Sequence, residues 1–315
     1  VVNVKTQVLA GWLGATSPCG TSLRATHKDV ARYAFKDALG RVIQRIVECV
    51  DGGVLVFFPS YHVLGTVVDR WTDTGLLEIL RSLKRVVVEP KKGRARGRKN
   101  AREQKRALKS FALEVSELVR TRGGDVATCS AGACRANGCE SRLFLAVARG
   151  KLSEGIDFPG NAARAVVLVG IPYPSTHDLR VSLQRSYQDE RNRAGRGLSG
   201  RQWYQQEAFR ALNQAAGRVV RHRNDWGSVL CVDSRYGTNG ALSNLPRWLR
   251  PCVRQFRSCG EMCETIRTFC DRNLAKERSK ENHSVKKVTA PSKVDLDTHS
   301  VLVESSACAN VKTGP

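Results

Sequence analysis

Five short apolar runs constrain the fold of this chain more than any other feature. Each has the length of a β-strand, and they occupy residues 54–58, 85–89, 143–147, 165–171 and 229–233. A strand that is apolar at consecutive positions, rather than at every second one, is typical of a parallel sheet that helices cover on both faces. Because helical stretches alternate with the runs, we predict an α/β fold with a doubly wound, mostly parallel sheet.

The spacing of apolar residues elsewhere predicts the helices. Steps of three and four residues between apolar positions indicate amphipathic helices over residues 29–50, 61–71 and 250–273. Hydrophobic periodicity is absent from both ends of the chain. We therefore expect a lead-in at residues 1–22, one domain over 23–275 and a disordered tail over 276–315.

Two stretches inside that domain have an unusual composition. Residues 84–109 contain 12 Lys and Arg, and residues 123–141 are rich in Gly and Cys. We predict that the first is a basic segment, flexible over its KKGRARGRKN half, and that the second is an irregular surface insert. Both would be additions to the α/β domain rather than parts of its sheet.

The chain is strongly basic, which points to a polyanionic partner. It has 52 Lys and Arg against 29 Asp and Glu, a formal net charge of +23, and 41% of its 315 residues are hydrophobic, enough for a large core. No run of about 18 apolar residues is present, so no membrane span is expected. The 11 Cys are odd in number, which favours reduced thiols in a cytosolic or nuclear compartment. Because the single Met is Met262, we expect a piece of a longer polypeptide.

Three segments place phosphate-binding chemistry at the end of an expected strand, where ligands bind in open α/β sheets. In the first, Ser60 and Tyr61 begin an expected helix, which suits a phosphate, and an ordinary N-cap is the alternative. In the second, glycines let the backbone approach a phosphate, and Asp157 could accept a hydrogen bond from a ribose hydroxyl. Its candidates are Arg149, Gly150, Lys151, Glu154, Gly155 and Asp157. A plain turn would explain the second segment equally well.

The third segment carries aligned arginines. Gln214, Arg218 and Arg221 fall at positions i, i+4 and i+7, which would put an amide and two guanidinium groups on one helix face. Guanidinium groups stabilise the charge on a phosphoryl group in its transition state. Gly217 costs a helix about 1 kcal/mol relative to Ala, which suggests close approach of a backbone or a ligand. The alternative is a solvated basic helix that binds nucleic acid.

The cysteines and His222 do not predict a metal site. Cys129, Cys134 and Cys139 lie five residues apart with no fourth ligand nearby in the sequence, unlike the closely paired cysteines of zinc sites. Three others fall on an expected helix and are typical of small apolar core residues: Cys259, Cys263 and Cys270. We expect His222 to pack or to form a hydrogen bond, and a catalytic role is the alternative.

Together the three segments resemble motifs IV, V and VI of superfamily 2 helicases. The sequences are FFPSY, ARGKLSEGIDF followed by ARAVVLVGIPYP, and GRQWYQQEAFRALNQAAGRVVRHRNDWG, in the order and spacing of that family. They are most similar to the iron–sulfur DNA helicases of the xeroderma pigmentosum group D type, in the branch of the Fanconi anaemia group J helicase. The resemblance covers roughly residues 23–273. It implies a RecA-like fold, that of the second motor domain.

The resemblance also implies a role for each candidate residue. The catalytic group, with Arg218 and Arg221 as arginine fingers on the ATP phosphates, is Gln214, Arg218 and Arg221. The ATP-binding group is Glu154, Gly155, Asp157 and Gly217. The DNA-binding group is Ser60, Tyr61, Arg149, Gly150 and Lys151.

Other parts of such a helicase have no counterpart in the sequence. A Gly-rich Walker A loop, an Asp-Glu-Ala-His box for Mg²⁺ and four clustered cysteines all belong to the first motor domain of the family, and these motifs are absent here. The resemblance therefore implies that ATP and Mg²⁺ are bound mainly by that missing domain. A 4Fe–4S cluster is expected only there.

The sequence thus leads to one hypothesis and one alternative. The hypothesis is the C-terminal motor half of a nuclear, ATP-dependent 5′-to-3′ DNA helicase of DNA repair, inactive when alone. Its expected partners are single-stranded and forked DNA, the first motor domain in cis, and DNA-repair proteins. The alternative is a stand-alone nucleic-acid-binding motor remnant without ATPase activity.

Overall fold

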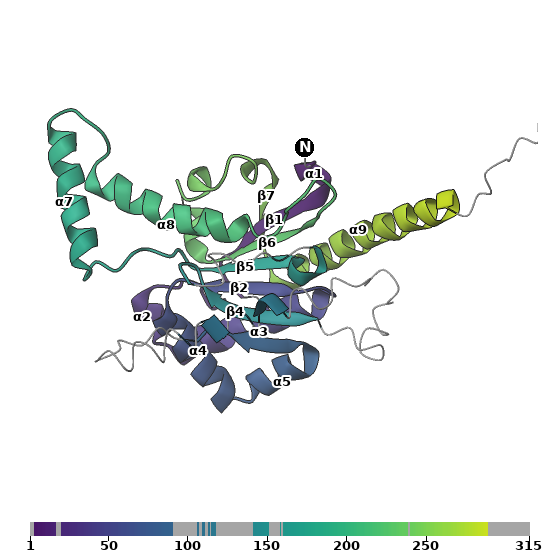
Figure 1. Ribbon diagram of the computed structural model, residues 1–315. Helices are drawn as coiled ribbons and strands as arrows, with labels where there is room; N and C mark the ends of the chain where they lie inside the picture. The colour runs from purple at the N-terminus through teal and green to yellow at the C-terminus, as the bar shows by residue number, and fades with distance from the viewer. Residues whose placement is uncertain are drawn as a thin grey trace, which may run out of the picture. The chain divides into compact units, whose positions relative to one another are not determined.

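The computed structural model describes residues 3–16, 20–90, 106, 109–110, 113, 115–117, 141–150, 158, 160–238 and 240–288 (Figure 1). It divides the chain into a compact unit of residues 1–277 and a second unit of residues 278–315. The described part of the first unit contains seven strands. They are β1 (Val8–Leu13), β2 (Val54–Phe58), β3 (Arg85–Val88), β4 (Arg142–Val147), β5 (Ala165–Val169), β6 (Gly227–Val232) and β7 (Val253–Phe256).

The seven strands form one sheet in the order β3-β4-β2-β5-β6-β1-β7, and every pair is parallel. The described helices are α1 (Val4–Gln7), α2 (His27–Val30), α3 (Tyr33–Cys49), α4 (Tyr61–Asp73), α5 (Leu76–Leu83), α7 (Leu179–Arg193), α8 (Gly200–Ala216) and α9 (Cys259–Val288). Short 3₁₀ turns add Gly160–Ala163, Ser234–Gly237, Leu242–Asn244 and Arg250–Cys252. The predicted doubly wound, RecA-like parallel sheet is confirmed.

Hydrophobic layers cover both faces of the sheet, as the continuous apolar runs require. On β2, Val54, Val56 and Phe58 join a layer with α3, α4, α5 and α9, while Leu55 and Phe57 join the layer that contains α8. The alternation arises because successive side chains of a strand point to opposite faces. Figure 1 shows α3 to α5 gathered near β2 and β4, and α8 near β5 and β6.

The predicted strands and helices are found with small changes of boundary. The five runs correspond to β2, β3, β4, β5 and β6, and residues 61–71 fall within α4. The helix expected over residues 29–50 is divided into α2 and α3, with a turn at Ala31 and Arg32 between them. None of the described helices combines the length and hydrophobicity needed to cross a membrane.

The lead-in expected over residues 1–22 is wrong, because Val8–Leu13 forms β1 between β6 and β7. All six residues of β1 are buried. Gly11 has a packing reason: a Cβ there would meet the ring of Phe256 and would lie 2.8 Å from the backbone oxygen of Arg254 on β7. Gly11 pairs with Arg254 on β7, and the ring of Phe256, two residues further along that strand, occupies the space that a side chain at position 11 would need.

The helix expected over residues 250–273 is also wrong at its start. Residues 250–252 form a 3₁₀ turn, 253–256 form β7, and α9 begins at Cys259. The helix then continues to Val288, so residues 276–288 are helical rather than disordered as expected. The rest of the expected tail lies outside the described residues, as does most of the basic segment.

The first residue of the basic segment has a structural role. Lys84 is buried, and its Nζ donates to the backbone oxygens of Val50 at 2.6 Å and Gly52 at 3.0 Å and to Ser141 Oγ at 2.9 Å. The ammonium group therefore fastens the turn before β2 to the residue before β4. Lys84 therefore contributes to the folded core.

Candidate functional site

The parallel sheet separates the candidate residues into two groups. Because all strands run in one direction, their carboxyl ends share one edge of the sheet and their amino ends share the opposite edge. Ser60 follows β2 and Gly150 follows β4, at the carboxyl edge, whereas residues 217–226 immediately precede β6, at the amino edge. The expectation that all three segments follow strands is therefore corrected for the third one. One ligand group cannot contact the ends of both edges, so the geometry points to two separate contact surfaces.

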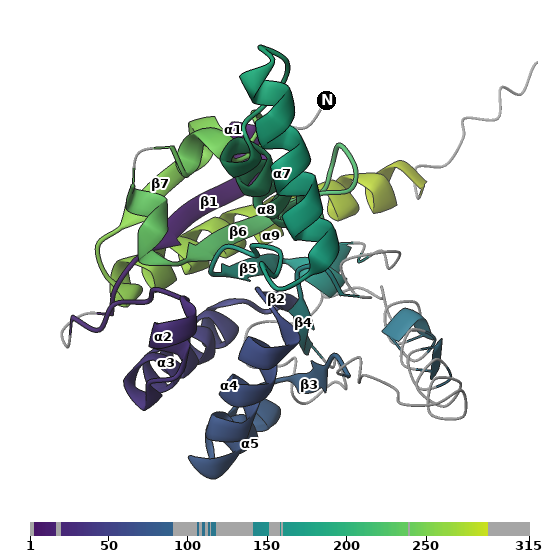
Figure 2. The ribbon, with the colours of Figure 1, turned by 90° about the vertical axis from the view of Figure 1, so that its left-hand side faces the viewer.

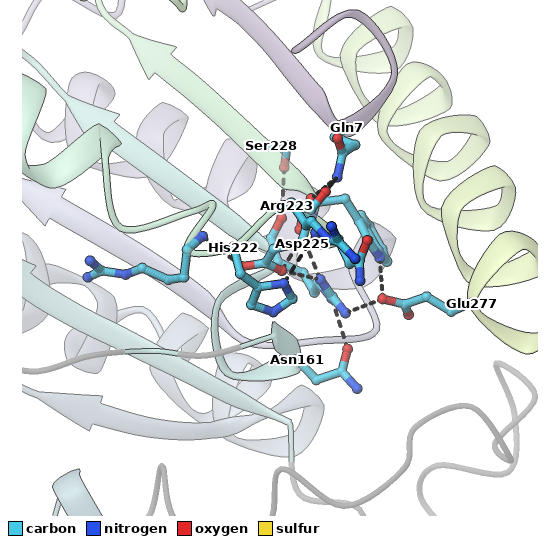
Figure 3. A network of polar contacts seen from close by, with 11 residues as sticks. Gln7, Asn161, His222, Arg223, Asp225, Ser228 and Glu277 are labelled. Atoms are coloured by element: carbon cyan, nitrogen blue, oxygen red, sulfur yellow. Dashed lines mark hydrogen bonds and ion pairs between the residues drawn. The ribbon is translucent and has the colours of Figure 1, made fainter. Parts of the chain in front are cut away.

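The loop at the amino edge, residues 221–226, is held by Asp225 (Figure 3). The Asp225 side chain is 1% exposed. Its Oδ2 accepts from the backbone N–H of Arg221 at 3.0 Å, and its Oδ1 accepts from the backbone N–H of Trp226 at 3.0 Å and from Arg164 Nη1 at 3.0 Å. Gln7, just before β1, donates from Nε2 to the backbone oxygens of Arg223 and Asp225 at 2.8 and 2.7 Å. The loop is thus fixed at both ends.

Arg164, just before β5, is the central cation of this network. Its guanidinium lies 4.1 Å from the Trp226 ring centroid and donates to the backbone oxygen of Trp226 at 2.9 Å. Its Nη2 donates to Glu277 Oε1 on α9 at 2.9 Å, and the same oxygen accepts from Trp226 Nε1 at 2.7 Å. A buried guanidinium requires this degree of pairing, because an unpaired buried charge is strongly destabilising. The network therefore ties the loop, β5 and α9 together.

The predicted helix face that would carry Gln214, Arg218 and Arg221 is not formed as expected. Helix α8 ends at Ala216, and Gly217 is its C-cap with right-handed backbone angles, φ −66° and ψ −3°. Arg218 lies in the following turn and is half-buried, and Arg221 lies in the loop with an exposed side chain. The position of Arg221 is set by its backbone contact with Asp225 rather than by helical spacing.

Gln214 lies on the exposed side of α8, near its end. It lines a hollow of about 500 Å³ together with neighbours on α8 and one residue from a later turn. The other lining residues are Gln206, Phe209, Arg210, Asn213 and Asn244. Gln214 is thus open to a ligand from the side of α8.

At the carboxyl edge, the first two candidate segments meet at the buried carboxylate of Glu89. Tyr61 Oη donates to Glu89 Oε1 at 2.8 Å, and the backbone N–H of Val147 donates to Glu89 Oε2 at 2.9 Å. A Cβ on Gly150 would collide with both Glu89 oxygens, so a larger residue there would force the Glu89 carboxylate to move. Glu89 therefore joins the ends of β2, β3 and β4, and it explains Gly150 by packing.

Ser60 and Arg149 each have an intramolecular partner at this edge. Ser60 Oγ accepts from the backbone N–H of Val63 at 3.3 Å, the N-cap of α4 that was the alternative reading. Arg149 Nη2 donates to the backbone oxygen of Glu207 on α8 at 2.7 Å, and its Nη1 lies 4.0 Å from the Glu207 carboxylate. The Arg149 side chain is still 39% exposed, so one side of the guanidinium remains open to an anion.

The remaining candidates lie outside the described residues. These are Lys151, Glu154, Gly155 and Asp157, as well as Cys129, Cys134 and Cys139. The chain is described again at Phe158, whose ring packs edge-on against Phe144 of β4 with centroids 5.1 Å apart. Among the described residues, no group of three or more His, Cys, Asp and Glu side chains could hold a metal ion.

The amino edge offers the guanidinium groups of Arg218 and Arg221. The carboxyl edge offers the Arg149 guanidinium and the N-terminus of α4. Guanidinium groups and helix N-termini both bind phosphates. Sequence reasoning missed the residues that support them: Arg164, Asp225, Glu277 and Glu89. A signal existed for Glu89, because an acidic residue that directly ends a run of valines has to be paired when buried. Arg164 has a similar signal, since it directly precedes a wholly apolar strand.

Comparisons with known proteins identify the family. The family model described as the Helicase C-terminal domain matches residues 43–252. The Fanconi anemia group J protein homolog of Gallus gallus is 35% identical over 269 residues, which are 85% of this chain and 20% of that protein. Regulator of telomere elongation helicase 1 of Mus musculus is 36% identical over 264 residues, 82% of this chain and 20% of that protein. The chain thus spans about a fifth of the length of these relatives.

One solved structure aligns with most of the chain. The structure of S. tokodaii Xpd4 covers 81% of this chain and 40% of its own, with 22% sequence identity and a TM-score of 0.43. The family assignment rests instead on the matched model, which covers more than half of the chain and includes β2, β4, β5, α8 and the Asp225 loop. As the resemblance of motifs IV, V and VI predicted, the chain belongs to the helicase C-terminal domain family.

Proposed function

We propose that this chain is the C-terminal motor half of an ATP-dependent DNA helicase that moves 5′ to 3′ and acts in DNA repair in the nucleus. One observation carries the proposal. The loop at residues 221–226 presents the exposed Arg221 side chain at the amino edge of the sheet, while its backbone is fixed by the buried Asp225 carboxylate. A charged side chain on a fixed backbone is what transition-state stabilisation requires, because the group does not have to reorganise during the reaction.

In this proposal, the amino edge acts on ATP. Arg221 and Arg218 are the arginine fingers, Gln214 reaches the phosphates, and Gly217 leaves room beside them. Glu154, Gly155 and Asp157 contact the nucleotide. ATP with its Mg²⁺ supplies the reactive phosphoryl group and is held mainly by a first motor domain in the same polypeptide. A 4Fe–4S cluster belongs to that other region.

The carboxyl edge grips single-stranded DNA, including the single strands of a fork. The open side of the Arg149 guanidinium would bind a phosphate while Glu207 holds its other side. Ser60, Tyr61 and Gly150 shape the surface around it through the N-cap of α4 and the Glu89 contacts, and Lys151 continues it. Closure and opening of the two motor domains would then move the strand. DNA-repair proteins are the expected further partners.

The experiment is a steady-state ATPase assay on the chain joined to the first motor domain of its polypeptide. Arg221→Ala should lower DNA-stimulated turnover by about 10³–10⁵-fold, the usual effect of an arginine finger, with a much smaller effect on nucleotide binding. Arg221→Lys should restore little, because an ammonium group lacks the planar fork of a guanidinium. The matched control is Arg223→Ala, an exposed arginine of the same loop, which should keep near wild-type turnover.

Three results would contradict the proposal in different ways. Normal turnover in Arg221→Ala would remove the finger assignment. Robust turnover by the isolated chain would contradict the half-motor hypothesis. If the joined protein binds DNA and shows no turnover, the stand-alone binding remnant is the better description.

A further inference from the structure

An aromatic and cationic stack lies just beyond the carboxyl end of β5. Tyr173 follows Ile171 and Pro172, and its ring stacks on that of Tyr204 on α8, with centroids 5.2 Å apart and planes at 20°. The Arg185 guanidinium of α7 lies 4.9 Å from the Tyr204 centroid. We call these three residues the Tyr173 stack. They come from a loop and two helices, so the tertiary fold assembles the stack.

A hydrogen bond and close helix packing hold the inner residues of the Tyr173 stack in place. Tyr204 Oη donates to the backbone oxygen of Pro174 at 2.7 Å, which fixes the inner ring to the loop that carries Tyr173. Burial raises the pKa of Tyr204, so this phenol stays neutral and keeps its donated hydrogen bond. At the start of α8, a Cβ on Gly200 would lie 2.5 Å from the backbone oxygen of Arg185, so α7 and α8 can approach closely only with glycine there. The inner members are therefore ordered before any ligand binds.

The outer ring, in contrast, is open. Tyr173 is 36% exposed, although an aromatic ring of this size gains stability from burial. None of the residues of α7, all of which the structure describes, is buried, and Figure 2 shows α7 standing in front of the sheet on this side. Within the described part of the chain, the buried Nε of Arg185 has no hydrogen-bond partner. Among the described residues, an exposed aromatic ring beside a guanidinium whose buried Nε has no hydrogen-bond partner is poorly explained by stability alone.

The charged groups near the Tyr173 stack indicate which class of ligand it binds. Arg149, with one side of its guanidinium open, is fastened to Glu207, three residues after Tyr204 on α8. A planar ring next to a cation offers a face for a base and a charge for the adjoining phosphate. This combination binds single-stranded nucleic acid, because bases without a pairing partner can stack on aromatic side chains. The net charge of +23 favours such a polyanion over an apolar protein partner.

We propose that Tyr173 is a stacking platform for one base of single-stranded DNA, supported by Tyr204 and Arg185, with Arg149 binding a neighbouring phosphate. The proposal rests on the proposed function, since it takes single-stranded DNA as the ligand, and it adds a contact that reads the flat face of a base. Because every base has such a face, the site holds the strand without selecting a sequence.

The test measures binding of a fluorescently labelled oligothymidylate to the full chain. Tyr173→Ala should weaken binding by about 5- to 150-fold, the range for loss of one stacked base. Tyr173→Phe should bind like the wild type, because the ring is retained. The matched control is Tyr187→Ala: Tyr187 is 52% exposed on α7 and has Arg191 5.8 Å from its ring centroid, yet it is not part of the Tyr173 stack, so its loss should leave binding unchanged.

A second ligand separates stacking from charge. An oligonucleotide with the same phosphates and abasic sugars should bind the wild type and Tyr173→Ala equally, since the base that Tyr173 contacts is gone. The dependence of affinity on salt should be the same in both proteins, because phosphate contacts are unchanged. Equal loss on both ligands, or a loss in Tyr187→Ala as large as in Tyr173→Ala, overturns the platform.

The outcomes also distinguish this inference from the proposed function. If the wild type does not bind the oligothymidylate, the DNA-binding role fails, and the platform fails with it. If the wild type binds with a steep salt dependence and Tyr173→Ala binds equally well, only the platform fails. A thermal melt of each variant identifies folding defects. If the Tyr173 ring only stabilises the loop, Tyr173→Phe will melt like the wild type and will bind the intact and the abasic ligand equally well. If the ring is the platform, Tyr173→Phe will melt like the wild type and will prefer the intact ligand.

Discussion

Replacing Asp225 with Ala tests whether a buried carboxylate holds the arginine loop. The substitution removes the acceptor of the Arg221 and Trp226 backbone N–H groups and one of the two carboxylates that pair with Arg164. The Arg164 side chain, 5% exposed, would then keep Glu277 as its one charged partner among the described residues. In the variant, the buried Arg164 charge is only partly neutralised, and the loop has lost the acceptor of two backbone N–H groups.

The size of the effect follows from this pairing. Breaking a buried ion pair by removing one partner costs about 3–5 kcal/mol. We expect the lower end for Asp225→Ala, because Glu277, whose side chain is 30% exposed, still neutralises part of the Arg164 charge. Arg164→Ala should reach the upper end, because it leaves the Asp225 carboxylate buried without its cation. For a domain of this size, such losses lower the melting temperature by about 6–20 °C.

The assay is thermal unfolding of both variants, followed by circular dichroism, with the double variant to complete a cycle. The double variant should be less destabilised than the two single changes added together, since it leaves no unpaired charge of this pair behind. The control is Asp37→Ala, which breaks the partly exposed bidentate pair with Arg70 and should lower the melting temperature less. A melting temperature for Asp225→Ala within about 2 °C of the wild type would refute the anchoring role.

Two further predictions concern packing and thiol chemistry. Gly150→Ala should destabilise the fold by about 1–3 kcal/mol in chemical denaturation, because its Cβ would collide with the Glu89 carboxylate, whereas Gly65→Ala, with open space around a helical glycine, should be neutral or stabilising; equal effects would contradict the Glu89 contact. Iodoacetamide near neutral pH should modify Cys259 before Cys231, as peptide mass spectrometry can show. The Cys263 thiol lowers the pKa of Cys259 by a hydrogen bond, and burial raises the pKa of Cys231 to about 12. Equal rates of labelling would exclude this order.

The strands that the sequence predicted are those whose apolar runs are continuous. Val54–Phe58 is buried on both faces, and no competing pattern of residues explains such a run. Strand β1 could not be predicted in this way, because its run is interrupted by Gly11, and the reason for the glycine lies on β7, more than 240 residues later. Strand β7 was absorbed into the helix that follows, because only one of its four residues, Phe256, is buried.

The candidate site shows the same division between local and tertiary information. Residue types were enough to single out Arg221 as chemistry-bearing, and the family resemblance supplied its expected role. The spacing of Gln214, Arg218 and Arg221 nevertheless predicted one helix that carries all three residues, whereas α8 ends at Ala216. The departure is decided by Asp225, which takes the backbone N–H of Arg221 and is itself held by Arg164, 61 residues earlier in the chain. Such a contact leaves no trace in local periodicity.

The place of β1 in the sheet bears on how the chain folds during synthesis. Val8 pairs with Gly227 and Leu13 with Val232, so β1 obtains its first neighbour only after about 220 more residues have been made. At about 5–20 residues per second, that interval lasts about 10–45 s, whereas β2 can meet β4 and β5 well before then. During this time the nascent chain carries an apolar strand with no partner, a natural binding site for chaperones that hold extended segments. Translation pauses before residue 232 would lengthen that exposure, and synonymous codons there would alter the yield of folded protein while leaving every side chain the same.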